Sequence, residues 1–174
     1  ATGACAAINN MIGGGEASYQ PVGNLFLDFS GQTATNYRRE LDLKTAIAKT
    51  TYTSGGVNYT REYFASYPDQ AIVVRLTANQ PGKITFTASL ESPHTNKTIS
   101  ASGTLITLNG TVNSIKFQTR ANISTDGGSV VVSGRTLKVS EANSATVLVV
   151  IGTNFNSYNN VTADQSARAE KYLS

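Results

Sequence analysis

The sequence SYQPVGNLFLDFSGQTATNYRRELDL, residues 18–43, sets a pattern that much of the chain repeats. Its first half is rich in apolar residues, which predict a strand with a mostly apolar face: Val22, Leu25, Leu27 and Phe29. A polar loop follows, and then Leu41 and Leu43 flank Asp42 in strict alternation. Such alternation is typical of a half-buried strand, so the stretch predicts two strands of a sheet.

The same alternation continues to residue 152, interrupted by turns that contain glycine or proline. We expect further strands at residues 45–53, 57–65, 70–78, 83–91, 104–109, 111–119, 129–134, 136–140 and 144–152. The glycine pair Gly55-Gly56 suits a hairpin turn, because glycine tolerates positive φ. Short strands at regular spacing are typical of a β-sandwich.

The last segment has a different period. Between Thr162 and Leu173, apolar residues recur at helical spacing, and Asp164 lies in the first turn. The sequence therefore predicts an all-β fold, a sandwich of two antiparallel sheets, with a short C-terminal helix.

Composition narrows the classes of protein to consider. The 174 residues and 40% hydrophobic content predict one folded domain spanning residues 1–174. The net charge of +3 is spread along the chain without a basic cluster, so we expect no nucleic-acid partner. No apolar run is long enough for a membrane span. The single cysteine, Cys5, cannot form an internal disulfide.

Four sequence blocks occur in a characteristic order: YQPVGNL at 19–25, YRRELDL at 37–43, REYFASYPDQ at 61–70 and VRL at 74–76. Their order and spacing resemble the N-terminal β-domain of glycoside hydrolase family 95, which contains α-L-fucosidases and some α-L-galactosidases. The resemblance extends over residues 11–173 and is densest before Pro93.

This resemblance implies a large, supersandwich-like β-domain that precedes a helical barrel, and it places the catalytic residues in that barrel. The chain would then be part of a larger multidomain glycosidase or a truncated stand-alone relative. The missing barrel is an implied partner, and no residue of this chain is expected to be catalytic.

The carboxylates agree with that expectation, because no pair stands out as the acid and base of a glycosidase. Glu40, Asp42, Glu62 and Asp69 lie in the family-like blocks. At the sheet ends we expect Arg38 and Arg39 with Glu40, and Arg61 with Glu62, to form ion pairs and backbone hydrogen bonds. The only histidine, His94, lies in a predicted solvated loop. One His and one Cys far apart make no metal site, and we expect no cofactor.

Carbohydrate is the expected ligand, and tyrosines are the candidate contacts. Sandwich domains bind sugars through exposed aromatic rings, and the chain has eight Tyr but no Trp. Four of them cluster around one predicted hairpin and the turn after it: Tyr52, Tyr59, Tyr63 and Tyr67.

Five Asn-x-Ser/Thr sequons, a mild excess over chance, are candidate glycosylation sites: Asn58, Asn96, Asn109, Asn122 and Asn160. The expectation that the protein is secreted follows mostly from the family resemblance. Three of the sequons, Asn96, Asn109 and Asn160, fall in predicted loops that could hold a glycan. The other two fall in predicted strands.

Three functions remain open at this point. The chain is a non-catalytic β-domain of a secreted α-L-fucosidase that supports carbohydrate binding or scaffolding, a stand-alone lectin-like protein derived from that domain, or an enzyme in its own right. The absence of a recognisable acid–base pair argues against the third.

Overall fold

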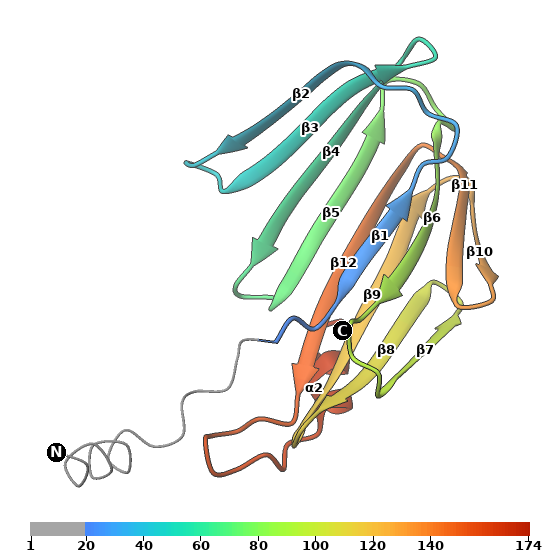
Figure 1. The fold of residues 1–174 in the computed structure, drawn as a ribbon. Coiled ribbons are helices and arrows are strands. Elements are labelled where there is room, and N and C mark those ends of the chain that lie inside the picture. Colours follow the sequence, from blue (N-terminus) through green and yellow to red (C-terminus); the bar gives the residue numbers. More distant parts are fainter. Residues whose placement is uncertain (1–19) are drawn as a thin grey trace, which may run out of the picture.

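The computed structural model describes residues 20–174, which form two antiparallel β-sheets and one short helix (Figure 1). This confirms the predicted fold class. The small sheet has the order β1 (Asn24–Asp28), β6 (Ile84–Glu91), β11 (Thr136–Ala142) and β10 (Ser129–Ser133). The large sheet has the order β2 (Thr35–Asp42), β3 (Ile47–Ser54), β4 (Val57–Ser66), β5 (Ala71–Ala78), β12 (Ser144–Thr153), β9 (Ile115–Asp126), β8 (Leu105–Val112) and β7 (Lys97–Ser102).

The hydrophobic core lies between the two sheets. In β6, every second residue from Ile84 to Leu90 is buried, as the alternating sequence predicts. The small sheet contacts β5, β7, β8 and β9 of the large sheet. The largest fully buried side chains of this core come from both layers: Leu76, Ile84, Ile106, Leu108, Ile123, Leu137, Val139 and Val147.

One predicted turn is wrong. The sequence places a break at Gly110 and a new strand at 111–119, whereas β8 continues through Gly110 to Val112 and turns at Asn113. Gly110 pairs with Phe117, whose ring lies 2.1 Å from where a Cβ atom would be. Glycine is therefore needed at this position to make room for an aromatic side chain.

The predicted C-terminal helix is present as α2, Gln165–Lys171. Asp164 caps its N-terminus, because the side chain accepts hydrogen bonds from the backbone N–H groups of Ser166 and Ala167. Ala169 packs with Ala71 and Val150 on the outer face of the large sheet, away from the core.

The two sheets differ in width, so among residues 20–174 β2 and the adjoining parts of β3 and β4 extend beyond the small sheet, although Tyr52, Val57 and Tyr59 at the other end of β3 and β4 are buried in the core. Figure 1 shows β2 and β3 extending past β1, which is the edge of the small sheet. The prediction that Leu41 belongs to a half-buried strand is wrong for this reason, since β2 is exposed along its whole length.

Within residues 20–174, no helix is long and apolar enough to cross a membrane. Cys5, which the sequence analysis considered, lies outside this range.

Candidate functional site

The structure does not bring the four predicted tyrosines into one platform. Tyr52 and Tyr59 are buried and stack on each other, with ring centroids 5.1 Å apart. Tyr63 is half-buried, whereas Tyr67 is 86% exposed in the turn between β4 and β5. Carbohydrate binding by these residues stays a prediction.

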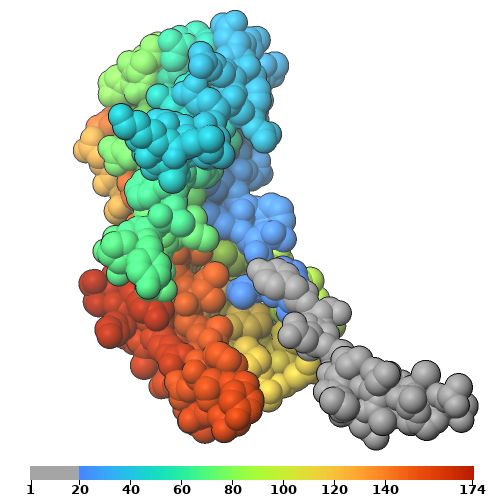
Figure 2. Space-filling model, turned by 90° about the vertical axis from the view of Figure 1, so that its left-hand side faces the viewer, coloured from blue at the N-terminus to red at the C-terminus, as the bar shows by residue number. Residues whose placement is uncertain are grey.

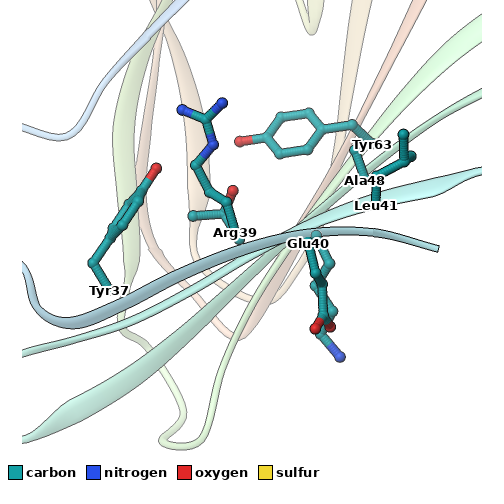
Figure 3. A pocket seen from close by; sticks show the side chains of 8 residues that line it. Tyr37, Arg39, Glu40, Leu41, Ala48 and Tyr63 are labelled. Atoms are coloured by element: carbon teal, nitrogen blue, oxygen red, sulfur yellow. The ribbon is translucent and has the colours of Figure 1, made fainter.

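An open groove of about 510 Å³ lies on the part of the large sheet that the small sheet does not reach. We call its inner-face residues the uncovered face: Tyr37, Arg39, Leu41, Ala48, Thr50 and Tyr63. Figure 3 shows the side chains of Tyr37, Arg39 and Tyr63 on one side of the strands and Glu40 on the other. Of these residues, the sequence analysis proposed only Tyr63 for a site.

Strand register explains why these side chains share a face. Leu41 pairs with Ala48, Ala48 with Tyr63, and Tyr63 with Val74. Val74 is 5% exposed in the core, whereas Leu41 in the same row is 60% exposed. The uncovered face is thus the core side of the sheet, continued beyond the second layer.

A second cluster adjoins this face at an open pocket of about 310 Å³. The Arg61 guanidinium lies 3.7 Å from the centroid of the Phe29 ring and 4.8 Å from that of Tyr52. Arg61 also donates to the Tyr52 hydroxyl at 2.6 Å, and that hydroxyl donates to Gln32 Oε1 at 2.6 Å. We call these four residues the Arg61 cluster.

The environment of the Arg61 cluster shifts the pKa of the Tyr52 hydroxyl. Burial raises the pKa of the Tyr52 hydroxyl above its ordinary value, and the hydrogen bond from Arg61 only partly offsets the effect. Tyr52 is therefore a neutral donor at physiological pH.

Charges are distributed unequally between the two faces of this half-sheet. On the outer face, Arg38 pairs with Glu40 at 2.7 Å, and Lys49 lies in register with Glu62. On the inner face, Arg39 and Arg61 share one register row through Thr50. Within residues 20–174, neither arginine forms a salt bridge, and the buried Nε of Arg61 has no hydrogen-bond partner. The ion pairs predicted for these two arginines are absent from that range.

An apolar cavity of about 270 Å³ opens beside β1, between the two sheets. Leu25 and Leu27 of β1 line one side, and Tyr63 and Val74 of the large sheet line the other. Thr119 also lines it, and its buried hydroxyl has no hydrogen-bond partner among the described residues.

The carboxylates of the family-like blocks do not form a catalytic pair. Glu40 and Glu62 share a row on the outer face with Lys49 between them. Hydrogen bonds from the backbone of Lys44 and the side chain of Thr45 lower the pKa of Asp42, so this group stays ionised at neutral pH. A general acid needs the opposite shift. Asp69 accepts a hydrogen bond from Ser66 in an exposed turn.

His94 differs from its predicted role as a solvated loop residue. Its Nε2 lies 2.8 Å from the Pro21 carbonyl oxygen, and its ring meets Phe117 edge-on at 5.7 Å. The side chain therefore ties the segment before β1 to the large sheet. Among residues 20–174, no three His, Cys, Asp or Glu side chains gather as metal ligands.

The sequons lie in different environments. Asn96 and Asn160 are exposed outside the strands, as predicted, and Asn58 and Asn122 lie in β4 and β9. Asn109 was predicted in a loop but lies in β8, where its Oδ1 accepts a hydrogen bond from Gln118. Glycosylation at any of the five stays a prediction.

Comparison with known families gives one match over most of the chain. Residues 2–158 match the family described as glycosyl hydrolase family 65, N-terminal domain. A solved structure assigned as a kojibiose phosphorylase from the human microbiome aligns with a TM-score of 0.55 at 13% identity. The alignment covers 88% of this chain and 25% of that one, and it shows a shared fold.

Curated relatives share more sequence over shorter segments. Alpha-L-fucosidase 2 of Arabidopsis thaliana is 47% identical over 78 residues, which is 42% of this chain and 9% of that protein. Probable alpha-fucosidase A of Aspergillus niger is 38% identical over 97 residues, which is 53% of this chain and 12% of that protein. The chain thus spans about a tenth of the length of these relatives, and the resemblance to the fucosidase family is confirmed.

Proposed function

Because the chain belongs to the glycosyl hydrolase family 65 N-terminal domain family, we propose that it is the non-catalytic β-domain of a fucosidase-type glycoside hydrolase. In this role, residues 1–174 form one domain that scaffolds the part of the enzyme where catalysis takes place. The observation that carries the proposal is the family match over residues 2–158, together with alignments that cover only about a tenth of each fucosidase relative.

The chemistry of the described residues supports a scaffold rather than a catalyst. Glycoside hydrolysis uses two carboxyl groups on opposite sides of the scissile bond, one of them held protonated. Glu40 and Glu62 instead lie on an outer face with Lys49 between them. General acid–base assistance is worth roughly 10²–10⁴-fold in rate, and this arrangement does not supply it.

An activity assay tests the proposal directly. The purified 174-residue chain is incubated with an aryl α-L-fucoside, and we expect no turnover above buffer. Turnover that survives purification and falls in Glu40→Ala or Glu62→Ala, with unfolding midpoints unchanged, would contradict the proposal.

A second candidate function is carbohydrate binding, either within such an enzyme or by a stand-alone lectin-like protein. It is favoured by the groove, where Tyr37, Tyr63 and the Arg39 guanidinium lie on the same side (Figure 3). Aromatic rings stack on sugar faces, and a guanidinium binds hydroxyl groups. Tyr67 offers a further exposed ring in the β4–β5 turn.

Sugar binding is tested by titrating fucosylated oligosaccharides against the chain and against Tyr63→Ala and Tyr67→Ala. An affinity near 1 mM, about −4 kcal/mol, is expected for so open a groove. If NMR chemical shifts of the parent chain do not change on titration, carbohydrate binding is excluded and the scaffold role remains.

We further propose that the protein is secreted and carries glycans at Asn96 or Asn160, whose side chains are exposed outside the strands. Intact-mass measurement of protein from its natural source, before and after amidase treatment, tests this. An unchanged mass would contradict glycosylation.

A further inference from the structure

β10 is an edge strand of the small sheet, and its outer side pairs with no other strand among residues 20–174. Figure 1 shows it beyond β11, at the side of the sheet that is farther from β1. Its sequence, SVVVS, contains three β-branched residues and no charge or proline. Such a composition favours pairing with another strand.

The edges of the large sheet differ from β10 in this respect. Figure 2 shows β2 and β3, in blue and cyan, at one end of the molecule. β7, at the other edge of the large sheet, begins with Lys97. The edge strand β2 contains the charged residues Arg38, Arg39, Glu40 and Asp42. Charged side chains on an edge strand disfavour the approach of a further strand, so β10 lacks a protection that these two edges have.

The hairpin between β10 and β11 determines which backbone groups face the free edge. Its two-residue turn begins with Gly134, at φ 61°. In such a hairpin the flanking residues, here Ser133 and Thr136, form a hydrogen-bonded pair, and these pairs alternate along the ladder. The N–H and C=O groups of Val130 and Val132 are therefore directed away from β11, towards the free edge.

The side chains of β10 leave apolar rows incomplete at this edge. On the inner face, Val130 and Val132 pair with Val139 and Leu137, which are both fully buried. Val130 packs against the core, whereas Val132 is 39% exposed although it belongs to the same face. On the outer face, Val131 is 57% exposed. A further strand beside β10 would cover these valines.

The strand that fits this edge is β10 of a second copy, because SVVVS reads the same in both directions. Antiparallel pairing about Val131 places Val130 of one copy beside Val132 of the other, which continues the apolar rows of both cores. On the outer face, it places Ser129 of one copy beside Ser133 of the other. Apolar pairs and hydroxyl pairs across strands both stabilise a sheet.

The charges at the two ends of β10 are complementary under the same pairing. Asp126 precedes the strand and Arg135 follows it, and both are exposed. Neither forms a salt bridge within residues 20–174, and Asp126 accepts only a long hydrogen bond, 3.4 Å, from Asn143. Antiparallel pairing brings the end of one strand to the start of the other, so each Arg135 approaches Asp126 of the other copy.

We propose that β10 is a self-association site, at which two copies of the chain pair antiparallel about Val131 and join their four-stranded small sheets into one. Val130 and Val132 exchange backbone hydrogen bonds across the pair, and Val131 lies on the two-fold axis. The contact is isologous, so it closes at the dimer. It is independent of the proposed scaffold role, because it lies at the edge of the small sheet away from the uncovered face.

Sedimentation equilibrium of the 174-residue chain tests the association. A five-residue strand gives an interface well below the ~1,200 Å² of stable complexes, so we expect a Kd on the order of 0.1 mM and no species larger than a dimer. Raising the protein concentration should slow hydrogen exchange at the amides of Val130 and Val132. The amide of Val131, which is directed to β11, is the internal control. A chain that stays monomeric, or that forms larger oligomers, would overturn the proposal.

Substitutions at Val131 test whether the dimer forms at this edge. Val131→Lys places two ammonium groups opposite each other on the two-fold axis and should weaken association at least tenfold. Val131→Thr keeps a β-branched side chain and should associate as the parent does. Urea midpoints at low protein concentration show that both variants are folded. A dimer that Val131→Lys does not weaken forms at another surface, and the proposal is then wrong.

Cysteine cross-linking tests the register and direction of the pair, independently of the charge variant. In a Cys5→Ser background, chains with Ser129→Cys are mixed with chains with Ser133→Cys and oxidised. We expect disulfides mainly between the two kinds of chain, because residues facing each other in a pair without hydrogen bonds have Cα atoms about 4.5 Å apart. Lys138→Cys, on the same face but one strand from the edge, is the control and should not cross-link. Equal cross-linking within one kind of chain, or in the control, would indicate parallel pairing or random collision and would contradict the proposed interface.

Discussion

The two halves of the large sheet have the same strand chemistry and different environments. In one register row, Val147 and Ile123 are fully buried beneath the small sheet, whereas Leu41 at the other end of the row is mostly exposed. Alternation of apolar residues therefore identifies the inner face but not whether anything covers it. That second property depends on the width of the opposing sheet, which is a matter of topology.

The difference has a consequence for stability. Burial of apolar area stabilises a fold by about 25 cal/mol per Å², so most of the folding free energy resides where the sheets overlap. β2 contributes backbone pairing to β3 and little else, because every residue in it is exposed. We expect β2 to open locally at lower free energy than the rest of the sheet.

The largest expected contrast comes from one substitution made in each half. Leu76→Ala, in β5 of the covered half, should lower the free energy of unfolding by about 2–5 kcal/mol, because the residue is 1% exposed and leaves a cavity. Leu41→Ala should change it by less than about 0.5 kcal/mol. Urea denaturation of both variants measures the difference. Similar losses would mean that the uncovered half is covered in solution.

A smaller effect is expected where the covered half is packed most closely. Gly110→Ala would place a Cβ atom 2.1 Å from the Phe117 ring, and overpacking of this kind costs about 1–3 kcal/mol. Phe117→Leu in the same background should recover part of the loss, although the single Phe117→Leu variant is itself destabilised. A double variant no better than the sum of the single ones would contradict this cause.

Sequence reasoning identified most of the strands because their alternation is local, but it missed β7 (Lys97–Ser102), and it failed where the cause was distant. Gly110 resembled a turn residue, and only its partner Phe117 on the next strand explains it. In the same way, Asn109 resembled a loop sequon although it is hydrogen-bonded within β8. Cross-strand neighbours are not visible in a single sequence without the register.

The candidate site was predicted in part. Tyr63 was predicted as an exposed aromatic residue, and it does line the groove. Tyr52 and Tyr59 were predicted in the same way, because sequence spacing does not show that they are buried and stacked on each other. Arg39 and Arg61 were expected in ion pairs because acidic residues follow each of them directly. Adjacent residues in a strand point to opposite faces of the sheet. An acidic residue directly after an arginine therefore lies on the other face, which argues against an ion pair between the two.

The raised pKa of Tyr52 allows a test of how tightly the region between the covered and uncovered parts of the large sheet is packed. Its pKa is raised in the folded protein, so between the unfolded value near 10 and the folded value only the folded state holds this proton. Stability from this group is complete below pH 10 and is lost as the pH rises through the folded pKa. In a titration of phenolate absorbance, we expect Tyr52→Phe to remove a late-titrating component. An unchanged late component would exclude Tyr52 as its origin.

The smallest contrast concerns one ion pair in each half. Arg38 and Glu40 are 2.7 Å apart, with side chains 75% and 41% exposed, and such pairs contribute about 0–1 kcal/mol. Arg120 and Glu170 join β9 to α2 at 3.5 Å, with the Arg120 side chain only 15% exposed.

We expect Glu40→Ala to be nearly neutral, and to become fully neutral in 1 M salt, where screening acts within about 3 Å. Glu170→Ala should cost more and retain part of its cost in salt, because Arg120 is shielded from counterions. Urea midpoints at low and high salt measure both effects, and an Arg38–Glu40 pair that proved the stronger would indicate an additional layer over that end of the sheet.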